Sequence, residues 1–158
     1  MTEDKMEFSI LTQHQAEDIA YNWRYEGIYS FYNMTANLEN LQDFLHKKKR
    51  AHHVLAVTQY DQLIGFVQLQ PVNQHVVEIG LGLKPSLTGQ GIGITFLQAI
   101  LHYIKQETNF TTVTLAVAAF NQRAIITYER VGFIKQFDYT VEIEGTMYDY
   151  LHMLLTFH

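Results

Sequence analysis

The feature that most constrains the fold lies in residues 81–96, which read Leu-Gly-Leu-Lys-Pro-Ser-Leu-Thr-Gly-Gln-Gly-Ile-Gly-Ile-Thr-Phe. An alternating apolar strand stops at Pro85, and a glycine-rich loop leads into an apolar helix without an acidic residue in its first turn. The first N–H groups of a helix have no partner within it, and the helix dipole is positive at that end. We therefore expect an anion site, which the glycines let the main chain approach closely.

Two familiar phosphate-binding patterns do not fit this loop. A P-loop requires Lys and then Ser or Thr directly after its last glycine, where this chain has Ile94 and Thr95. A dinucleotide-binding pattern counted from Gly89 or Gly91 would need its third glycine at Ile94 or Phe96. Spacing excludes both patterns, and a glycine turn with a purely structural role remains as the alternative to an anion site.

A second pattern begins at residue 121. Asn121, Ala124 and Tyr128 lie three and seven residues apart along an expected helix, and Gly132-Phe133 follow them. This spacing places the three side chains on one helix face. A long ligand along that face would meet an amide, a methyl group and a phenol in turn. Each residue also has an ordinary structural reading, as an N-cap, a close-packing alanine and a core aromatic.

Together the two patterns resemble the GNAT superfamily of acyl-CoA-dependent N-acetyltransferases. That family has Arg/Gln-x-x-Gly-x-Gly/Ala after a strand, where this chain reads Thr88-Gly89-Gln90-Gly91-Ile92-Gly93. The family's second pattern, Asn-x-x-Ala-x-x-x-Tyr-x-x-x-Gly-Phe, is intact at residues 121–133. Thr88 departs from the family's usual Arg or Gln, which removes one polar contact but keeps the backbone cradle.

The resemblance implies acetyl-CoA as co-substrate and assigns its binding residues. The loop would hold the pyrophosphate, and the helix from Asn121 would guide the pantetheine arm, with Tyr128 near the thioester sulfur. The backbone of Leu81 and Leu83 would pair with the pantetheine amides. The cofactor-binding residues expected on this basis are Leu81, Gly82, Leu83, Thr88, Gly89, Gln90, Gly91, Ile92, Gly93, Ile94, Asn121, Ala124 and Tyr128.

Amide formation from an amine and a thioester needs a group that removes a proton and one that supplies a proton. Holding an alkyl amine in its neutral form at pH 7 costs roughly 4.6 kcal/mol, because the pKa of its ammonium form is about 10.4. The departing thiolate needs a donor, and Tyr128 is the candidate. Glu78 is the candidate base, because alternation places it on one strand face with Gly80 and Gly82, whose missing side chains leave a groove. A bulge would re-aim Glu78, and a surface glutamate or a water relay to another residue stays open.

The whole chain, residues 1–158, predicts one α/β domain. We expect strands at 8–11, 54–60, 63–69, 75–83, 111–117, 133–143 and 146–157, the last two forming a closing hairpin through Glu144-Gly145. Helices are expected at 12–21, opened by a Thr12–Gln15 capping box, after Asn37 as a cap, at 92–106, and at 121–131, where Gly132 ends the helix. Apolar residues recur every four positions along 92–106 and indicate one buried face. No repeat or linker interrupts this order, so a mixed sheet follows. The GNAT fold has the same order of elements, and the resemblance implies a mostly antiparallel sheet of about seven strands flanked by about four helices.

Composition excludes several classes of function. Of the 158 residues, 47% are apolar and 17% charged, which is typical of a globular chain. The formal net charge of −5 argues against a nucleic-acid partner, and the basic run 47–50 is expected to stay solvated at the end of a helix. Zero cysteines exclude disulfides and a cysteinyl acyl-enzyme. No apolar run reaches the roughly 18 residues of a membrane span, and the acidic first residues are unlike a signal peptide, so a cytoplasmic protein without a membrane partner is expected.

Several other residues have weaker claims. The eight histidines, including His52-His53, lack metal-ligand spacing, so no metal site is expected. His75 is either a proton relay or a surface histidine at a strand end. Two cations that flank the motifs could meet CoA phosphates or stay solvated, and two residues of the last strand have a structural role or contact the acceptor. These four residues are Arg123, Lys84, Asp149 and Met153.

We therefore predict an N-acetyltransferase that moves an acetyl group from acetyl-CoA directly to a primary amine in a ternary complex. The alternative is a non-catalytic acyl-CoA-binding sensor or assembly module, which Thr88 and the open choice of base favour. The acceptor is a small-molecule or peptide amine of unspecified identity. The aromatic residues within 21–34 either line its site or pack a core, and the apolar closing strands leave a homodimer open.

Overall fold

Seven strands are hydrogen-bonded in the order β1-β2-β3-β4-β5-β7-β6 in the computed structural model, which describes residues 5–50 and 53–158. Their bounds are β1 (Glu7–Ile10), β2 (Val54–Gln59), β3 (Gln62–Pro71), β4 (Val76–Leu83), β5 (Thr112–Ala118), β6 (Ile134–Ile143) and β7 (Thr146–Thr156). Strands β1 and β2, β2 and β3, β5 and β7, and β6 and β7 pair antiparallel, whereas β4 and β5 pair parallel. The predicted mixed, mostly antiparallel sheet is confirmed.

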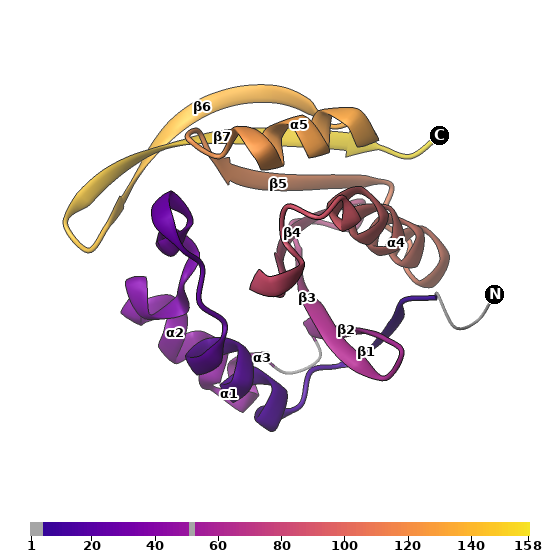
Figure 1. Cartoon of the computed structure of the whole chain (residues 1–158). Helices are drawn as coiled ribbons and strands as arrows, with labels where there is room; N and C mark the ends of the chain where they lie inside the picture. Colours follow the sequence, from indigo (N-terminus) through magenta and orange to yellow (C-terminus); the bar gives the residue numbers. More distant parts are fainter. Residues whose placement is uncertain (1–4, 51–52) are drawn as a thin grey trace. The chain divides into compact units, whose positions relative to one another are not determined.

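The helices follow the predicted order and include short turns that the sequence pattern did not indicate (Figure 1). The α-helices are α1 (Gln13–Asn22), α2 (Leu38–Leu45), α3 (Lys47–Arg50), α4 (Ile92–Glu107) and α5 (Gln122–Val131). The 3₁₀ turns are η2 (Gly27–Tyr32), η3 (Met34–Ala36) and η4 (Pro85–Leu87). Among the described residues, no helix is both long enough and apolar enough to cross a membrane.

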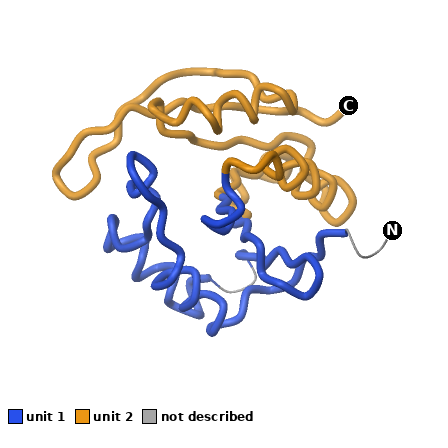
Figure 2. Tube along the Cα trace, viewed as in Figure 1, with its two compact units in different colours: residues 1–68, 81–88 blue, residues 69–80, 89–158 orange. Residues whose placement is uncertain are grey.

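The chain groups into two compact units, which are described separately (Figure 2). Unit 1 comprises residues 1–68 and 81–88, and unit 2 comprises residues 69–80 and 89–158. Strand β4 therefore belongs to unit 2 at its start and to unit 1 at its end. The acidic first four residues and His52 lie outside the described residues. A single domain over 1–158 stays a prediction.

Helix α1 in unit 1 begins with the predicted capping box. The Thr12 hydroxyl accepts the Gln15 N–H at 3.1 Å, and the Gln15 side chain accepts the Thr12 N–H at 2.9 Å. These two bonds satisfy donors that the helix start would otherwise leave unpaired. The inner face of α1 then enters a core cluster made of Leu11, Ala16, Ile19, Ala20, Trp23, Phe44, Val54 and Ala56. Trp23 thus packs a core, and a role of the other aromatic residues within 21–34 in lining the acceptor site stays a prediction.

The basic run 47–50 differs from its predicted solvated state at one position. Arg50 is only 3% exposed, and its guanidinium donates to the Phe44 carbonyl at 2.6 Å and to the Gln13 amide oxygen at 2.8 Å. Charged side chains are buried where they are paired or hydrogen-bonded, and here two polar partners from α1 and α2 surround the guanidinium. The prediction was wrong for Arg50, because sequence spacing does not show which side of a four-residue turn faces the core.

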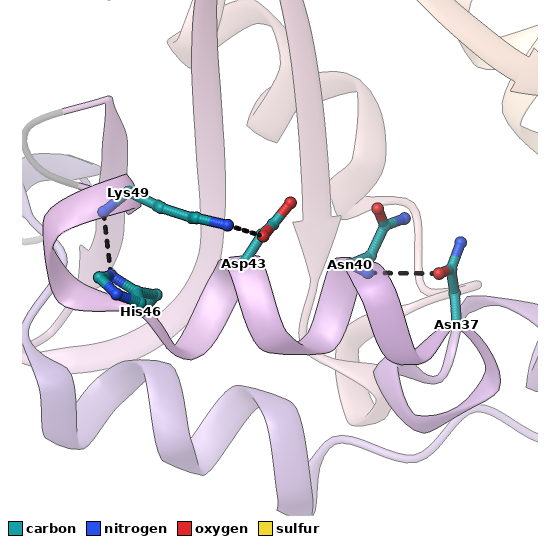
Figure 3. A network of polar contacts seen from close by, with 5 residues as sticks. All are labelled: Asn37, Asn40, Asp43, His46 and Lys49. Carbon is teal, nitrogen blue, oxygen red and sulfur yellow. Dashed lines mark hydrogen bonds and ion pairs between the residues drawn. The ribbon is translucent and has the colours of Figure 1, made fainter.

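The three lysines of this run are exposed, and Lys49 belongs to a polar network at the α2–α3 junction (Figure 3). Asn37 caps α2 as predicted, since its side-chain oxygen accepts the Asn40 N–H at 3.2 Å. Lys49 donates to Asp43 at 2.8 Å, and its backbone N–H donates to His46 Nδ1 at 3.4 Å. The Lys49–Asp43 pair is half-exposed or more, so it contributes little to stability.

Unit 2 has its core between the sheet and one face of α4. The buried residues of α4 are Phe96, Leu97, Ile100, Leu101 and Ile104, as the predicted four-residue spacing requires. Val113, Leu115 and Val117 of β5 are buried on one side of their strand. Strands β6 and β7 form a long hairpin whose turn, Glu144-Gly145, has positive φ angles of 51° and 81° (Figure 1). The predicted closing hairpin is confirmed.

Candidate active site

The glycine loop follows the short turn η4. Thr88 ends this turn, and its hydroxyl donates to the Pro85 carbonyl at 2.8 Å, while its N–H donates to the same carbonyl at 3.2 Å. The side chain that replaces the family's Arg or Gln is thus used to close its own turn. Thr88 lies at the end of unit 1, and the glycines begin unit 2.

Helix α4 begins as an anion site requires. Its N-cap is Gly91, which has φ 82° and ψ −2° and supplies no side-chain hydrogen bond to the helix. The first turn contains no acidic residue. Gly89 also has a positive φ, 73°, in a region that L-residues with a side chain rarely adopt. The loop therefore turns its main chain into α4 through a glycine N-cap, which has no side chain to occupy the first N–H groups of the helix.

The two sequence motifs lie against each other within unit 2. A Cβ built on Gly89 would be 3.4 Å from Nη1 of Arg123, so the guanidinium from α5 lies beside the loop. A Cβ built on Gly93 would be 3.9 Å from the Thr127 methyl group. Helix α5 therefore runs past the start of α4 and adds a cation next to its positive end. Of the two flanking cations, Arg123 and Lys84, it is Arg123 that lies beside the glycines of the loop within unit 2.

The residues of the second motif occupy the start and one face of α5. Asn121 is the N-cap, and its side-chain oxygen accepts the Ala124 N–H at 3.1 Å. Ala124 and Tyr128 are half-buried, and the Tyr128 ring meets Phe133 edge to face at 5.9 Å between centroids. Gly132, with φ 123°, ends the helix, as predicted. Asn121 therefore has the structural role of its alternative reading, and a ligand along this face stays a prediction.

Glu78 lies where the parallel pairing of β4 with β5 ends. The described pairs run from Val76–Thr112 to Glu78–Thr114. The neighbours Val77 and Ile79 are buried, whereas the Glu78 side chain is 46% exposed. The predicted alternation is confirmed, and the carboxylate lies on the strand face opposite the apolar core. Its role as a base stays a prediction.

The groove that we expected at Gly82 is not present. A Cβ at this position would lie 2.3 Å from Cε1 of the Phe66 ring, so the ring occupies the space. Phe66 in turn packs near Trp23 and Phe44, at centroid distances of 6.3 and 5.4 Å. The missing side chain of Gly82 thus accommodates an aromatic cluster of unit 1. Gly80, in unit 2, is exposed.

A tyrosine that sequence reasoning left unassigned bonds to the end of β4. The Tyr25 hydroxyl donates to the Leu83 carbonyl at 2.7 Å, within unit 1. Asn33 accepts the Tyr25 N–H at 2.6 Å and so fixes the backbone of this residue. Burial raises the pKa of the Tyr25 phenol, which keeps it neutral as a donor. Leu83, a predicted cofactor-binding residue, therefore already shares its carbonyl with the aromatic segment.

The remaining candidate residues differ in their burial and in the unit to which they belong. His75 is exposed beside an open hollow of about 510 Å³ that Pro71 and Phe110 also line, as its surface reading predicts. Met153 is 1% exposed and belongs to the core of unit 2, whereas Asp149 is exposed and accepts the Ala119 N–H through its backbone. Lys84 lies in unit 1, where its N–H donates to Ile64. In ranges 5–50 and 53–158, no group of three or more His, Asp or Glu residues could hold a metal ion.

Known proteins match this arrangement in sequence and in fold. Mycothiol acetyltransferase from Salinispora tropica is 32% identical over 90 residues, which cover 54% of this chain and 29% of that protein's length. A GNAT-family acetyltransferase from Bacillus anthracis has the same fold, with a TM-score of 0.77 at 14% identity, over 98% of this chain and 96% of that one. Spermidine N-acetyltransferase from Vibrio cholerae, solved with CoA and spermine, gives a TM-score of 0.74 at 22% identity, over 96% and 95% of the two chains.

The family match covers most of the sequence. Residues 16–133 match the acetyltransferase (GNAT) family, from α1 through the end of the second motif. This range contains the glycine loop, Glu78 and Tyr128. The predicted fold class and the predicted transferase class are thereby confirmed, and the chain belongs to the acetyltransferase (GNAT) family.

Proposed function

We propose that this protein is an N-acetyltransferase that moves an acetyl group from acetyl-CoA directly to a primary amine in a ternary complex. The observation that carries the proposal is the start of α4, which has no side-chain cap and lies against the second family motif. A helix start of this kind binds phosphate groups through its backbone N–H groups. Acetyl-CoA carries a diphosphate and a long thiol arm, which fit the loop and the α5 face respectively.

In this proposal, residues 89–94 hold the pyrophosphate and α5 guides the pantetheine arm past Ala124 toward Tyr128. The Arg123 guanidinium, which lies beside Gly89, is placed to offset the diphosphate charge. The polar contact of the family's Arg or Gln is missing at Thr88, whose hydroxyl is bonded to the Pro85 carbonyl. In this proposal the Arg123 guanidinium replaces part of that contact. Pairing of the cofactor with Leu81 and Leu83 is part of the same proposal.

The reaction requires three proton transfers and one exchange of bonds. Glu78 takes a proton from the acceptor ammonium, and the amine lone pair then attacks the acetyl carbon. A new C–N bond forms while the C–S bond breaks, and the leaving thiolate takes a proton from the Tyr128 hydroxyl. The nitrogen of the new amide loses its second proton, which restores the Tyr128 phenol, so that the products are the neutral amide and the free thiol. The Glu78 carboxylate, whose side chain is 46% exposed, must then lose the proton that it took from the ammonium before the next turnover. The chain contains no cysteine, so direct transfer needs no cysteinyl intermediate.

An amine acceptor agrees with the chemistry of the similar proteins. One is a mycothiol acetyltransferase, and another is a spermidine N-acetyltransferase solved with spermine. The net charge of −5 also favours approach of a cationic acceptor. We propose a primary alkyl amine as the acceptor class.

The test combines a binding assay with a turnover assay. Acetyl-CoA should raise the melting temperature of the protein while NAD and ATP should not, and thiol release should depend on an added amine from a panel of polyamines, amino sugars and peptides. Tyr128→Phe should lower kcat, with acetyl-CoA affinity kept within about threefold, because a lost acid affects the transition state and not binding. Tight acetyl-CoA binding without thiol release on any amine would favour the non-catalytic module. Absence of acetyl-CoA binding would refute both.

A further inference from the structure

The imidazole of His152, on β7 in unit 2, is held from three sides. Its Nδ1 lies 3.0 Å from the side-chain oxygen of Gln136, and its ring stacks on Phe137 at 4.6 Å between centroids with 7° between planes. Its Nε2 lies 3.9 Å from the Glu78 carboxylate. The His152 side chain is 17% exposed, less than half the exposure of Glu78. The His152 ring, which faces the proposed base, is therefore fixed in orientation.

A bulge in β6 produces this orientation. Lys135 pairs with Met153 and Phe137 pairs with His152, so Gln136 is an extra residue opposite no partner of its own. A bulge of this kind re-aims side chains at the point where it occurs. Here it directs both an amide oxygen and an aromatic face at the same imidazole. An amide oxygen only accepts hydrogen bonds, so with Gln136 oriented in this way Nδ1 carries the hydrogen and Nε2 faces Glu78 with its lone pair.

A buried hydroxyl lies on the same face of the sheet as the two groups. Glu78 pairs with Thr114 across β4 and β5, and His152 pairs with Ala116 across β7 and β5, so all four lie on one face of the sheet. Thr114 is 5% exposed, and its hydroxyl oxygen has no hydrogen-bond partner in the described part of the chain. A buried polar atom of this kind normally bonds to water or to a ligand. The short side chain of Ala116, which is exposed, leaves room beside it.

We propose that His152 is a positioning residue for Glu78 that takes over the proton Glu78 removes from the acceptor ammonium. This inference rests on the proposed function. The proton passes from the ammonium nitrogen to the Glu78 carboxylate and then to Nε2 of His152, while the Nδ1–H bond to Gln136 stabilises the imidazolium. The gap of 3.9 Å exceeds a direct hydrogen bond, and one water molecule can bridge it. The amine, left neutral, attacks the thioester as described above.

The other titratable groups on this face are phenols. Tyr139 on β6 stacks on Tyr150 of β7 at 5.8 Å between centroids. Burial, and to a lesser extent the charge of Glu78, raises the pKa of Tyr139, so this phenol stays protonated through the working range. Lys135 and Asp138 pair with each other at 2.8 Å. Glu78 and His152 are therefore the carboxylate and imidazole that the geometry brings together on this face.

The test compares His152→Gln, Glu78→Gln and the double variant in the thiol-release assay, from about pH 7 to about pH 10. His152→Gln should lower kcat at least about tenfold at neutral pH and leave the KM for acetyl-CoA within about twofold. The deficit should shrink as the pH approaches about 10, because an alkyl ammonium then loses its proton without help. The double variant should be no worse than Glu78→Gln, because one proton path is lost in both.

Matched variants separate this path from a loss of folding. His102→Gln removes an exposed histidine of α4 and should match the wild type at every pH. Gln136→Leu changes an exposed position of β6, keeps His152, and should give a smaller deficit with the same pH dependence. A deficit constant across pH, multiplicative losses in the double variant, or a His152→Gln rate equal to wild type would overturn the inference while leaving the transferase intact. A wild type that releases no thiol with any amine would refute the proposed function itself, and this inference with it.

Discussion

Alanine substitutions at Gly91 and at Gly145 distinguish the cost of backbone strain from the loss of a ligand site. Gly91 has φ 82°, and a Cβ there would have no neighbour within 4 Å. Gly145, in the β6–β7 turn, has φ 81° and the same open surroundings. An alanine in the left-handed region costs about 1–2 kcal/mol. Gly91→Ala and Gly145→Ala should therefore lose similar amounts of unfolding free energy, with a further few tenths to about 1 kcal/mol for Gly91→Ala, because alanine is a poor N-cap.

Their effects on acetyl-CoA binding should differ. If the diphosphate approaches the main chain at the start of α4, a methyl group on Gly91 projects toward it, and the dissociation constant should rise at least about tenfold, or about 1.4 kcal/mol. Gly145→Ala should leave that constant unchanged, because the hairpin turn has no part in the proposed site. Urea denaturation gives the two unfolding free energies, and isothermal titration calorimetry with acetyl-CoA gives the two affinities.

Two results of these measurements would refute the reasoning. Equal acetyl-CoA affinities for Gly91→Ala and Gly145→Ala would mean that the start of α4 is not the phosphate site. A Gly91→Ala variant as stable as the wild type would mean that the left-handed backbone at this N-cap relaxes without cost, and the strain argument would fail separately.

Three further predictions concern unit 1. Gly82→Ala should cost about 1–3 kcal/mol of unfolding free energy, because the new methyl group overpacks against the Phe66 ring. In a double-mutant cycle measured by urea denaturation, Phe66→Leu should recover part of this loss, and additive losses would contradict the contact. Tyr25→Phe should lose about 1–3 kcal/mol at pH 7, because the Leu83 carbonyl loses its donor. Since burial raises the pKa of Tyr25, its contribution is present below about pH 10 and is lost as the pH rises further, so the variant should show a smaller alkaline loss of melting temperature than the wild type; parallel curves would count against it. Arg50→Ala should lose about 2–3 kcal/mol and Lys49→Ala, which breaks an exposed pair, less than about 0.5 kcal/mol; equal losses would place Arg50 on the surface.

Local patterns predicted the elements because their causes are local. The Thr12–Gln15 capping box, the Asn37 cap and the four-residue spacing of α4 each depend on neighbours within a few positions, and each is present as predicted. The contact between the glycine loop and α5 also follows from short-range rules, since a parallel βαβ unit places successive elements side by side. The order of elements and the family could therefore be predicted from the chain.

Contacts between distant side chains could not be predicted in the same way. The hydrogen bond from Tyr25 to Leu83 joins residues 58 positions apart. The Phe66 ring occupies the space beside Gly82 because of how β3 and the aromatic cluster pack. Arg50 is buried by the way a short turn packs, and the bulge at Gln136 shifts a register that alternation alone would leave unbroken. Each depends on how elements pack, which periodicity does not specify.

The central claim is that the backbone at the start of α4 binds the diphosphate of acetyl-CoA. A crystal structure of the protein with acetyl-CoA bound tests it most directly. The account predicts pyrophosphate oxygens within about 3 Å of backbone nitrogens in residues 89–94, with the thioester sulfur beside the Tyr128 hydroxyl. Acetyl-CoA bound elsewhere, with those nitrogens bonded to the protein's own side chains, would contradict it.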